Sequence, residues 1–345
     1  MDAGSYRRSR HTFKAALDTI LCGERNHTGR SAQNRHGTCR CVTHGAFDWI
    51  LYHITLLGEY CFAMLLVALF YWVLNKKCGI YLIWNFFGAL VVNQFLKVTA
   101  CIYRPWILDN RIHPLEKAMK HATGYSFPSG HTAIATGTFG ALAVKFWSNK
   151  ILRYSLITMV FLIAFSRNYL CVHTPQDVVV SMIVGVGLLY VTSKVLKWIE
   201  NGKNRDLIAF GIILILCILL IIYTEFKHYP VDYLNGVILV DPEKMRFESF
   251  PKAGFALGAF TGWLLERRFV NFDAPQCGFW GKVLFFLFGG LILVYLQEYL
   301  TPIFLQYMSA PIGRFSSCFL IGLYITILYP LVIHFYNKKF ARKID

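Results

Sequence analysis

Long apolar runs dominate the chain from Phe47 onward and constrain its fold more than any other feature. The runs are about 18–22 residues long, the length a helix needs to cross the hydrocarbon core of a bilayer. Only 16% of the 345 residues are charged, whereas roughly a quarter are charged in soluble domains. Backbone N–H and C=O groups in lipid must be satisfied within the segment, so these runs are expected to be helices. The sequence therefore predicts an all-α, polytopic transmembrane helical bundle.

About nine spans are predicted. They lie near residues 54–75, 79–98, 129–147, 151–168, 176–196, 206–224, 253–270, 280–300 and 316–337. Lys and Arg concentrate in the loops after the odd-numbered spans and at the C-terminal end, which places those loops on the cytoplasmic side. The Arg-rich tail at the N-terminus disagrees with this orientation, because it would then lie outside.

The net charge of +16 does not predict a nucleic-acid partner. The basic residues are spread over the loops between spans, without a basic stripe or a nucleic-acid-binding signature. A basic surface beside anionic membrane lipids is the expected use of this charge.

Three polar segments stand where predicted spans meet polar connections. They are Lys97-(x)6-Arg104-Pro105, Pro128-Ser129-Gly130-His131 and Ser166-Arg167-(x)5-His173-(x)3-Asp177. Together they bring two histidines, one carboxylate and three cations to the membrane boundary. Such a set is suited to attack on a phosphate ester.

The segment around His173 predicts both a helix start and a catalytic group. Thr174 is the expected N-cap, Pro175 the first helical residue and Asp177 the capping-box acid. Asp177 lies one turn from His173, so its carboxylate can also orient the imidazole and stabilise the protonated ring. The cap and the catalytic role are compatible, and the second histidine segment favours catalysis over a purely structural His173.

The segment around His131 predicts the start of the third span. Ser129 is the expected N-cap, and the free N–H groups of the first turn face any anion bound there. A turn and a cap would explain the segment without catalysis. His131 nevertheless stands where a general acid would protonate a leaving oxygen, a role that suits the ordinary histidine pKa of about 6.5.

Three cations accompany these histidines, namely Lys97, Arg104 and Arg167. Each alone would be an ordinary snorkelling residue at the end of a span. As a group they predict a phosphate clamp, because guanidinium and ammonium groups neutralise the oxygens of a transferring phosphoryl group.

Metal and cofactor sites are not expected. The acidic residues near the three segments are Asp109, Glu116 and Asp177, too few and too scattered for a two-metal hydrolase. The pair Cys39-x-Cys41 lacks a second pair at ligand spacing, so it does not predict a metal site.

Taken together, the three segments resemble the signature of the type 2 phosphatidic acid phosphatase (PAP2) superfamily, which is KxxxxxxRP, PSGH and SRxxxxxHxxxD. Every fixed position is present, and the resemblance covers roughly residues 50–196. It implies a metal-independent phosphatase that works through a phosphohistidine. The soluble vanadium haloperoxidases share the signature, but the predicted spans argue against that branch.

The resemblance also implies roles for single residues. His173 is the expected nucleophile, Asp177 its partner and His131 the general acid. The expected phosphate ligands are Lys97, Arg104, Ser129, Gly130 and Arg167.

The chain is thus expected to have three parts: a polar Arg-rich tail (1–46), a PAP2-like catalytic membrane core (47–200) and a C-terminal transmembrane extension (201–345). The expected substrate is a lipid phosphate or diphosphate, hydrolysed at the outer face of the cell membrane. The topology of about nine spans is similar to the glucose-6-phosphatase branch, so a sugar-phosphate phosphatase is the alternative. A non-enzymatic lipid binder or transporter is a third reading, disfavoured because every catalytic position is present. The sequence selects neither the lipid nor an oligomeric state.

Overall fold

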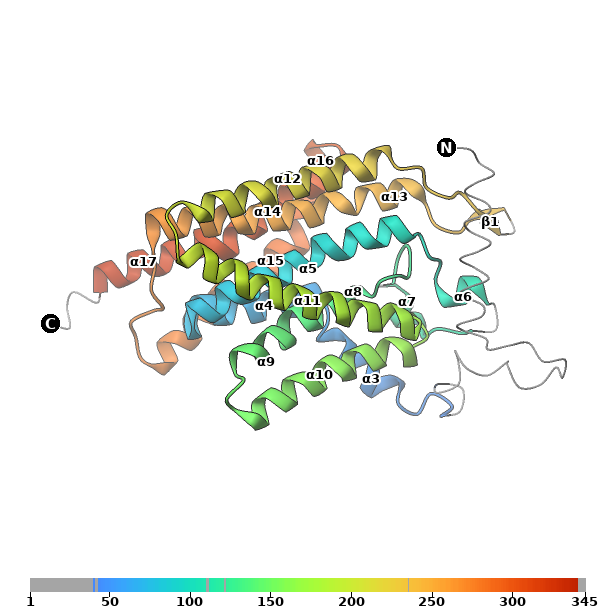
Figure 1. Ribbon diagram of the computed structural model, residues 1–345, viewed down its shortest axis with the longest axis horizontal. Helices are drawn as coiled ribbons and strands as arrows, with labels where there is room; N and C mark the ends of the chain where they lie inside the picture. The colour runs from blue at the N-terminus through green and yellow to red at the C-terminus, as the bar shows by residue number, and fades with distance from the viewer. Residues whose placement is uncertain (1–39, 41–42, 110–111, 121, 235, 341–345) are drawn as a thin grey trace.

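The computed structural model describes residues 40, 43–109, 112–120, 122–234 and 236–340. The chain forms an elongated bundle whose longer helices run roughly along its long axis (Figure 1). Most of the predicted tail, including both Cys39 and Cys41, lies outside the described residues.

The first half of the bundle is built around α5, whose residues 81–87 form an unbroken buried run. Its helices are α3 (Asp48–Leu56), α4 (Tyr60–Ala68), η1 (Leu69–Leu74), α5 (Lys76–Ala100), α6 (Pro105–Leu108), α7 (Glu116–Lys120), α8 (Gly130–Ala135), η2 (Thr136–Gly140), α9 (Ala141–Lys145), α10 (Lys150–Tyr169) and α11 (Pro175–Glu200). The segments labelled η are π-helical and continue the α-helices beside them.

The second half packs its helices against α5 and α4. Its elements are α12 (Arg205–Phe226), β1 (Tyr233–Leu234), β2 (Val237–Ile238), α13 (Pro242–Phe247), α14 (Ser249–Leu265), η3 (Glu266–Val270), α15 (Phe279–Tyr307), α16 (Ala310–Leu323), η4 (Tyr324–Leu328) and α17 (Tyr329–Phe340). The two short strands pair as an antiparallel hairpin, and the other elements of the described chain are helices.

Glycines at every fourth position bring α14 and α16 into close contact. A Cβ added at Gly254 or Gly258 would overlap the backbone carbonyl of Phe315 or Phe319, respectively. Gly262 repeats the spacing one turn later. Small residues in this pattern let membrane helices pack backbone to backbone, which fixes α14 in the bundle.

Six helical segments within the described residues are long and apolar enough to span a membrane. The count reaches up to seven if α3 and α4–η1, which meet at a bend of 48°, form one span. These segments match seven of the predicted spans. The predicted spans near 129–147 and 253–270 are helical as well, but they do not meet the same length and composition criteria. The chain is therefore an integral membrane protein, and the total of nine spans is not confirmed.

One end of the bundle collects the three polar segments. Helices α5 and α10 end there, α8 and α11 begin there, and α6, α7 and β1 lie at the same end (Figure 1). The segment that leads into the β1–β2 hairpin is tied to this end, because the Tyr103 hydroxyl donates to Asp232 Oδ2 at 2.7 Å. The topology thus brings together segments that are far apart in the sequence.

Candidate active site

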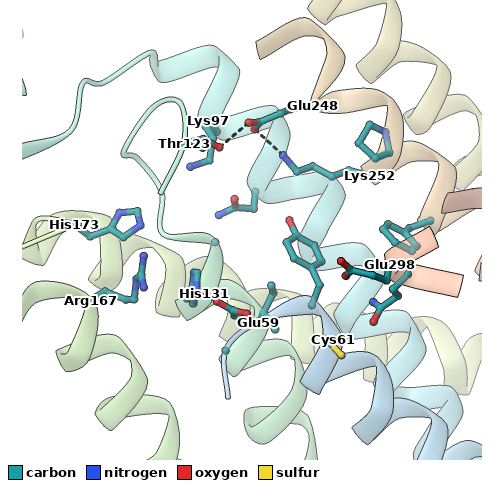
Figure 2. Close-up of a pocket in the computed structure, with 18 of the residues that line it drawn as sticks. Glu59, Cys61, Lys97, Thr123, His131, Arg167, His173, Glu248, Lys252 and Glu298 are labelled. Carbon is teal, nitrogen blue, oxygen red and sulfur yellow. Dashed lines mark hydrogen bonds and ion pairs between the residues drawn. The ribbon is translucent and has the colours of Figure 1, made fainter. Parts of the chain in front are cut away.

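The three polar segments converge on one cavity of about 550 Å³ (Figure 2). The predicted site residues that line it are Lys97, Arg104, Gly130, His131, Arg167 and His173. Ser129 and Asp177 are buried next to these residues but are not part of the lining.

His173 is presented by a tight loop between α10 and α11. The carbonyl oxygen of Arg167 accepts hydrogen bonds from the N–H groups of Val172 at 3.2 Å and His173 at 3.3 Å. The loop therefore folds back onto the last turn of α10. The next residues begin α11 with the predicted capping box of Thr174 and Asp177, which is confirmed.

Asp177 holds the Nδ1 edge of the His173 ring. Its Oδ2 lies 3.1 Å from His173 Nδ1 and accepts from Ser126 Oγ at 2.5 Å and the Thr174 N–H at 2.9 Å. On the other side, His173 Nε2 lies 2.9 Å from Arg104 Nη1, a permanent donor. These partners assign the hydrogen to Nδ1 and leave the lone pair on Nε2. Nε2 thus carries the lone pair of the ring, and this lone pair accepts from Arg104 Nη1.

The charge around His173 keeps the ring neutral. Its side chain is buried, and burial, Arg104 and Arg167 together hold the pKa of His173 well below its ordinary value. A base with a lowered pKa releases its proton at lower pH, so the imidazole is unprotonated near neutral pH.

Arg104 connects two loops to the His173 ring. Its Nε and Nη2 donate to the carbonyl oxygens of Gly124 and Thr123, each at 3.2 Å. Its Nη1 donates to the Val172 carbonyl oxygen at 2.9 Å as well as to the His173 ring. The guanidinium therefore fixes the geometry of the cavity wall and keeps a positive charge beside Nε2.

Arg167 and Lys97 are buried cations with few protein partners. Arg167 is 1% exposed and donates from Nη1 to Thr55 Oγ1 at 3.0 Å, while its Nε has no hydrogen-bond partner within the described residues. Lys97 is 6% exposed and donates to the Tyr125 carbonyl oxygen at 2.9 Å. Buried cations with unused donors are costly unless an anion joins them, so both side chains are suited to hold phosphate oxygens.

His131 enters the cavity from the first turn of α8. Ser129 caps this helix as predicted, accepting from the Thr132 N–H, and its own N–H donates to the Asp177 carbonyl oxygen at 3.1 Å. The starts of α8 and α11 are therefore tied together. Among the described residues, a Cβ on Gly130 would meet only Asn93 Oδ1, at 3.8 Å, so packing leaves room beside the helix start.

Glu59 is a site residue that the sequence did not single out. In the part of the chain that the structure describes, His131 Nε2 makes no hydrogen bond, and Glu59 Oε1 lies 3.8 Å away. Gly58 makes this approach possible, because a Cβ there would lie 2.9 Å from Ile163 and 3.2 Å from the Cβ of His131.

Two supporting residues were also missed. Thr55 accepts from Arg167, and Ser126 donates to Asp177. Their only sequence signal is a polar residue in an apolar setting, which is too common to identify a site.

The cavity reaches the surface in two places. Tyr60, Cys61, Val294 and Glu298 are exposed lining residues on α4 and α15, and Thr123 is an exposed lining residue in the loop before α8. The first group lies on α4 and on α15, which carries many exposed apolar side chains, whereas Thr123 lies among the polar loops. Within the described residues, no three His, Cys, Asp or Glu side chains come together as metal ligands.

Comparison with known proteins agrees with this arrangement. The PAP2 superfamily model matches residues 57–201, and a model described as PAP2 superfamily phosphatase, transmembrane extension, matches residues 250–340. The chain belongs to the PAP2 superfamily.

Two curated members of the superfamily are similar to part of this PAP2 chain. An undecaprenyl-diphosphatase of Sulfolobus acidocaldarius is 30% identical over 121 residues, which is 35% of this chain and 56% of the relative. Undecaprenyl-diphosphatase BcrC of Bacillus subtilis is 27% identical over 143 residues, which is 40% of this chain and 69% of the relative. The match therefore spans little more than half of the archaeal relative. No solved structure gives a significant match.

Proposed function

We propose that this protein is a metal-independent phosphatase that hydrolyses a lipid diphosphate or lipid phosphate at the outer face of the membrane. The observation that carries the proposal is the cavity itself. It joins a phosphate clamp around His173 to an opening between apolar membrane helices.

The first chemical step is attack of His173 Nε2 on the terminal phosphorus, once Arg104 Nη1 has moved its hydrogen bond from Nε2 to a phosphoryl oxygen. Arg104, Arg167 and Lys97 neutralise the phosphoryl oxygens, where charge is spread in such a transition state. The bond between phosphorus and the leaving oxygen breaks, and the leaving oxygen takes the electron pair. His131 supplies a proton to that oxygen.

The second step is hydrolysis of the phosphohistidine. The ring carries positive charge once Nε2 is bonded to phosphorus and Nδ1 keeps its hydrogen, so the Asp177 carboxylate stabilises this state from 3.1 Å. Neutral His131 then accepts a proton from water as the water attacks phosphorus. Inorganic phosphate leaves, and His173 Nε2 regains its lone pair.

A lipid substrate is supported by the opening between α4 and α15. The exposed residues nearby include Leu291 and Tyr295 at 70% and 58% exposure, as expected for a surface that faces acyl chains. A lipid bound with its phosphate in the clamp can leave its chain in hydrocarbon, where each CH₂ contributes about 0.8 kcal/mol. Both similar relatives carry the name undecaprenyl-diphosphatase, which supports an isoprenyl diphosphate.

The proposal is tested with purified protein in mixed micelles containing excess chelator. We expect phosphate release from a long-chain isoprenyl diphosphate, with kcat/KM more than about tenfold above that of a water-soluble analogue of the same headgroup. His173→Ala should abolish turnover and the labelled phosphoenzyme. His53→Ala is the matched control, because His53 is exposed on α3 and does not line the cavity.

Three results would contradict the proposal. Activity that disappears in chelator and returns with a divalent ion would exclude the metal-independent step. Turnover of His173→Ala near the wild-type rate would exclude the phosphohistidine. Equal efficiency on the soluble analogue, or a preference for a sugar phosphate, would favour the small-molecule phosphatase instead.

A further inference from the structure

The C-terminal half supplies a charged wall to the same cavity. Glu248 and Lys252, one turn apart at the start of α14, both line it together with the predicted clamp residues. Figure 2 shows Lys252 on the far side of the cavity from His173 and Arg167. This wall belongs to the transmembrane extension, for which the three polar segments give no role.

Lys252 keeps capacity for another ligand. Its ammonium group donates to Gln94 Oε1 on α5 and lies 3.3 Å from Glu248 Oε2. An ammonium group has three hydrogens to donate, and these two acceptors are its hydrogen-bond partners within the described residues. The distance to Glu248 exceeds the roughly 2.7–2.9 Å usual for a charge-assisted hydrogen bond, so this contact is weak. The third hydrogen of the ammonium group can therefore be donated to a bound anion.

Glu248 is held in place by groups other than Lys252. Its Oε1 accepts from Thr123 Oγ1 at 3.1 Å, in the loop that also contacts Arg104. Burial raises the pKa of Glu248, but Lys252 and Lys97 outweigh burial and the pKa is lowered. The carboxylate is therefore ionised, and it orients Lys252 when the cavity has no substrate.

The direction of phosphoryl transfer places the leaving group on this side. The attacking atom and the leaving oxygen stand roughly in line on opposite sides of phosphorus. Lys252 lies across the cavity from His173 (Figure 2), so a leaving group that points away from His173 points toward the side of the cavity that carries Lys252.

The geometry points to Lys252 as the ligand of the second phosphate of a lipid diphosphate, the phosphate attached to the lipid. This inference rests on the proposed function. In the reaction the bond from the terminal phosphorus to the bridging oxygen breaks, and the bridging oxygen keeps the electron pair as part of the departing lipid monophosphate. Lys252 neutralises that developing charge without giving up a proton. A simple monoester has no phosphate at this position, so Lys252 is a residue that favours diphosphates.

The test is the ratio of kcat/KM for an isoprenyl diphosphate to kcat/KM for the monophosphate of the same chain. We expect Lys252→Met to lower this ratio at least about tenfold, the loss typical of one hydrogen bond to a charged group. Lys252→Arg should keep most of the preference. Lys244→Met is the matched control, since Lys244 is exposed on α13, does not line the cavity and should leave the ratio unchanged.

The ratio is insensitive to the amount of folded protein, because both substrates are measured on one preparation. A second measure of the preference is the ratio of two inhibition constants, one for the methylene-bridged diphosphonate and one for the monophosphonate of that lipid. If Lys252→Met lowers both activities equally, Lys252 only holds α14 against α5 and the inference is wrong. If it lowers neither activity, the inference is wrong as well. In both cases the phosphatase function stands. A wild-type protein that hydrolyses neither substrate would overturn the proposed function together with this inference.

Discussion

Replacing Asp177 by asparagine separates the charge of this residue from its shape. Asp177 Oδ2 receives three donors, from His173, Ser126 and the backbone N–H of Thr174. The backbone donor cannot rotate away, so the amide oxygen of the introduced asparagine should occupy this position and its NH₂ group the other. The His173 ring then keeps its hydrogen on Nδ1, and only the negative charge is lost.

The size of the effect follows from the distance. Two full charges 3.1 Å apart interact by about 5 kcal/mol at an effective dielectric constant of roughly 20. The ring gains only part of a charge in the transition state, and the amide still accepts the hydrogen bond. We therefore expect a loss of about 3–4 kcal/mol, which is a fall in kcat of roughly 10²–10³-fold. A reversed ring tautomer would cost more, about 10⁴-fold.

The assay is rapid-quench formation of the phosphoenzyme, with thermal stability measured beside it. Thr174→Ala is the control, because it removes the cap hydroxyl but keeps the backbone N–H that holds Asp177. That change should cost about 1 kcal/mol of stability and little activity. If the two variants lose activity equally, Asp177 acts as a helix cap alone. If Asp177→Asn turns over at the wild-type rate, the charge has no role in catalysis.

Three further outcomes are expected. Glu59→Gln should lower kcat/KM for a lipid monophosphate about tenfold, since the carboxylate 3.8 Å from His131 Nε2 no longer stabilises the protonated ring; steady-state kinetics should give a smaller loss for a diphosphate, whose leaving group is less basic. Nitrogen NMR of labelled protein should show His173 titrating below the ordinary histidine value of about 6.5, because burial, Arg104 and Arg167 lower its pKa; titration above that value would contradict the neutral ring. In a variant without native cysteines, a cysteine introduced by Met119→Cys should react with an impermeant thiol reagent in intact cells and one introduced by Lys150→Cys should not; the opposite pattern would reverse the proposed orientation.

The parts of the fold that follow from local sequence were predictable. Apolar length identified the helical segments, and the caps at Ser129 and Thr174 were read from side chains within the same turn. The spans near 129–147 and 253–270 were harder to judge. Their helices pack largely inside the bundle, where α8 contacts α5, α10 and α11 and α14 contacts α5, α12 and α16, rather than facing lipid. Apolar length alone does not separate these two situations.

The chemistry of the site was predictable where it is encoded in spacing along the chain. Asp177 lies four residues from His173, in the first turn of the helix that follows this histidine, so their contact is local. Ser126 and Thr55 reach the site only through the tertiary fold, across 51 and 112 residues of sequence, respectively. A lone serine or threonine in an apolar segment usually bonds to its own helix backbone, so nothing local distinguished these two.

The three sequence motifs predict a reaction and not a substrate. The phosphoryl group that reaches His173 is identical in every lipid phosphate, so a clamp built for it carries no information about the leaving group. The leaving group meets other elements, namely α4, α14 and α15. The charged side chains Glu59, Lys252 and Glu298 lie there in largely apolar segments, and only the fold brings them to one cavity. Each charge held in such a setting is costly without a partner. Substrate preference in this protein should therefore change with substitutions at these positions, while substitutions in the clamp should slow all substrates together.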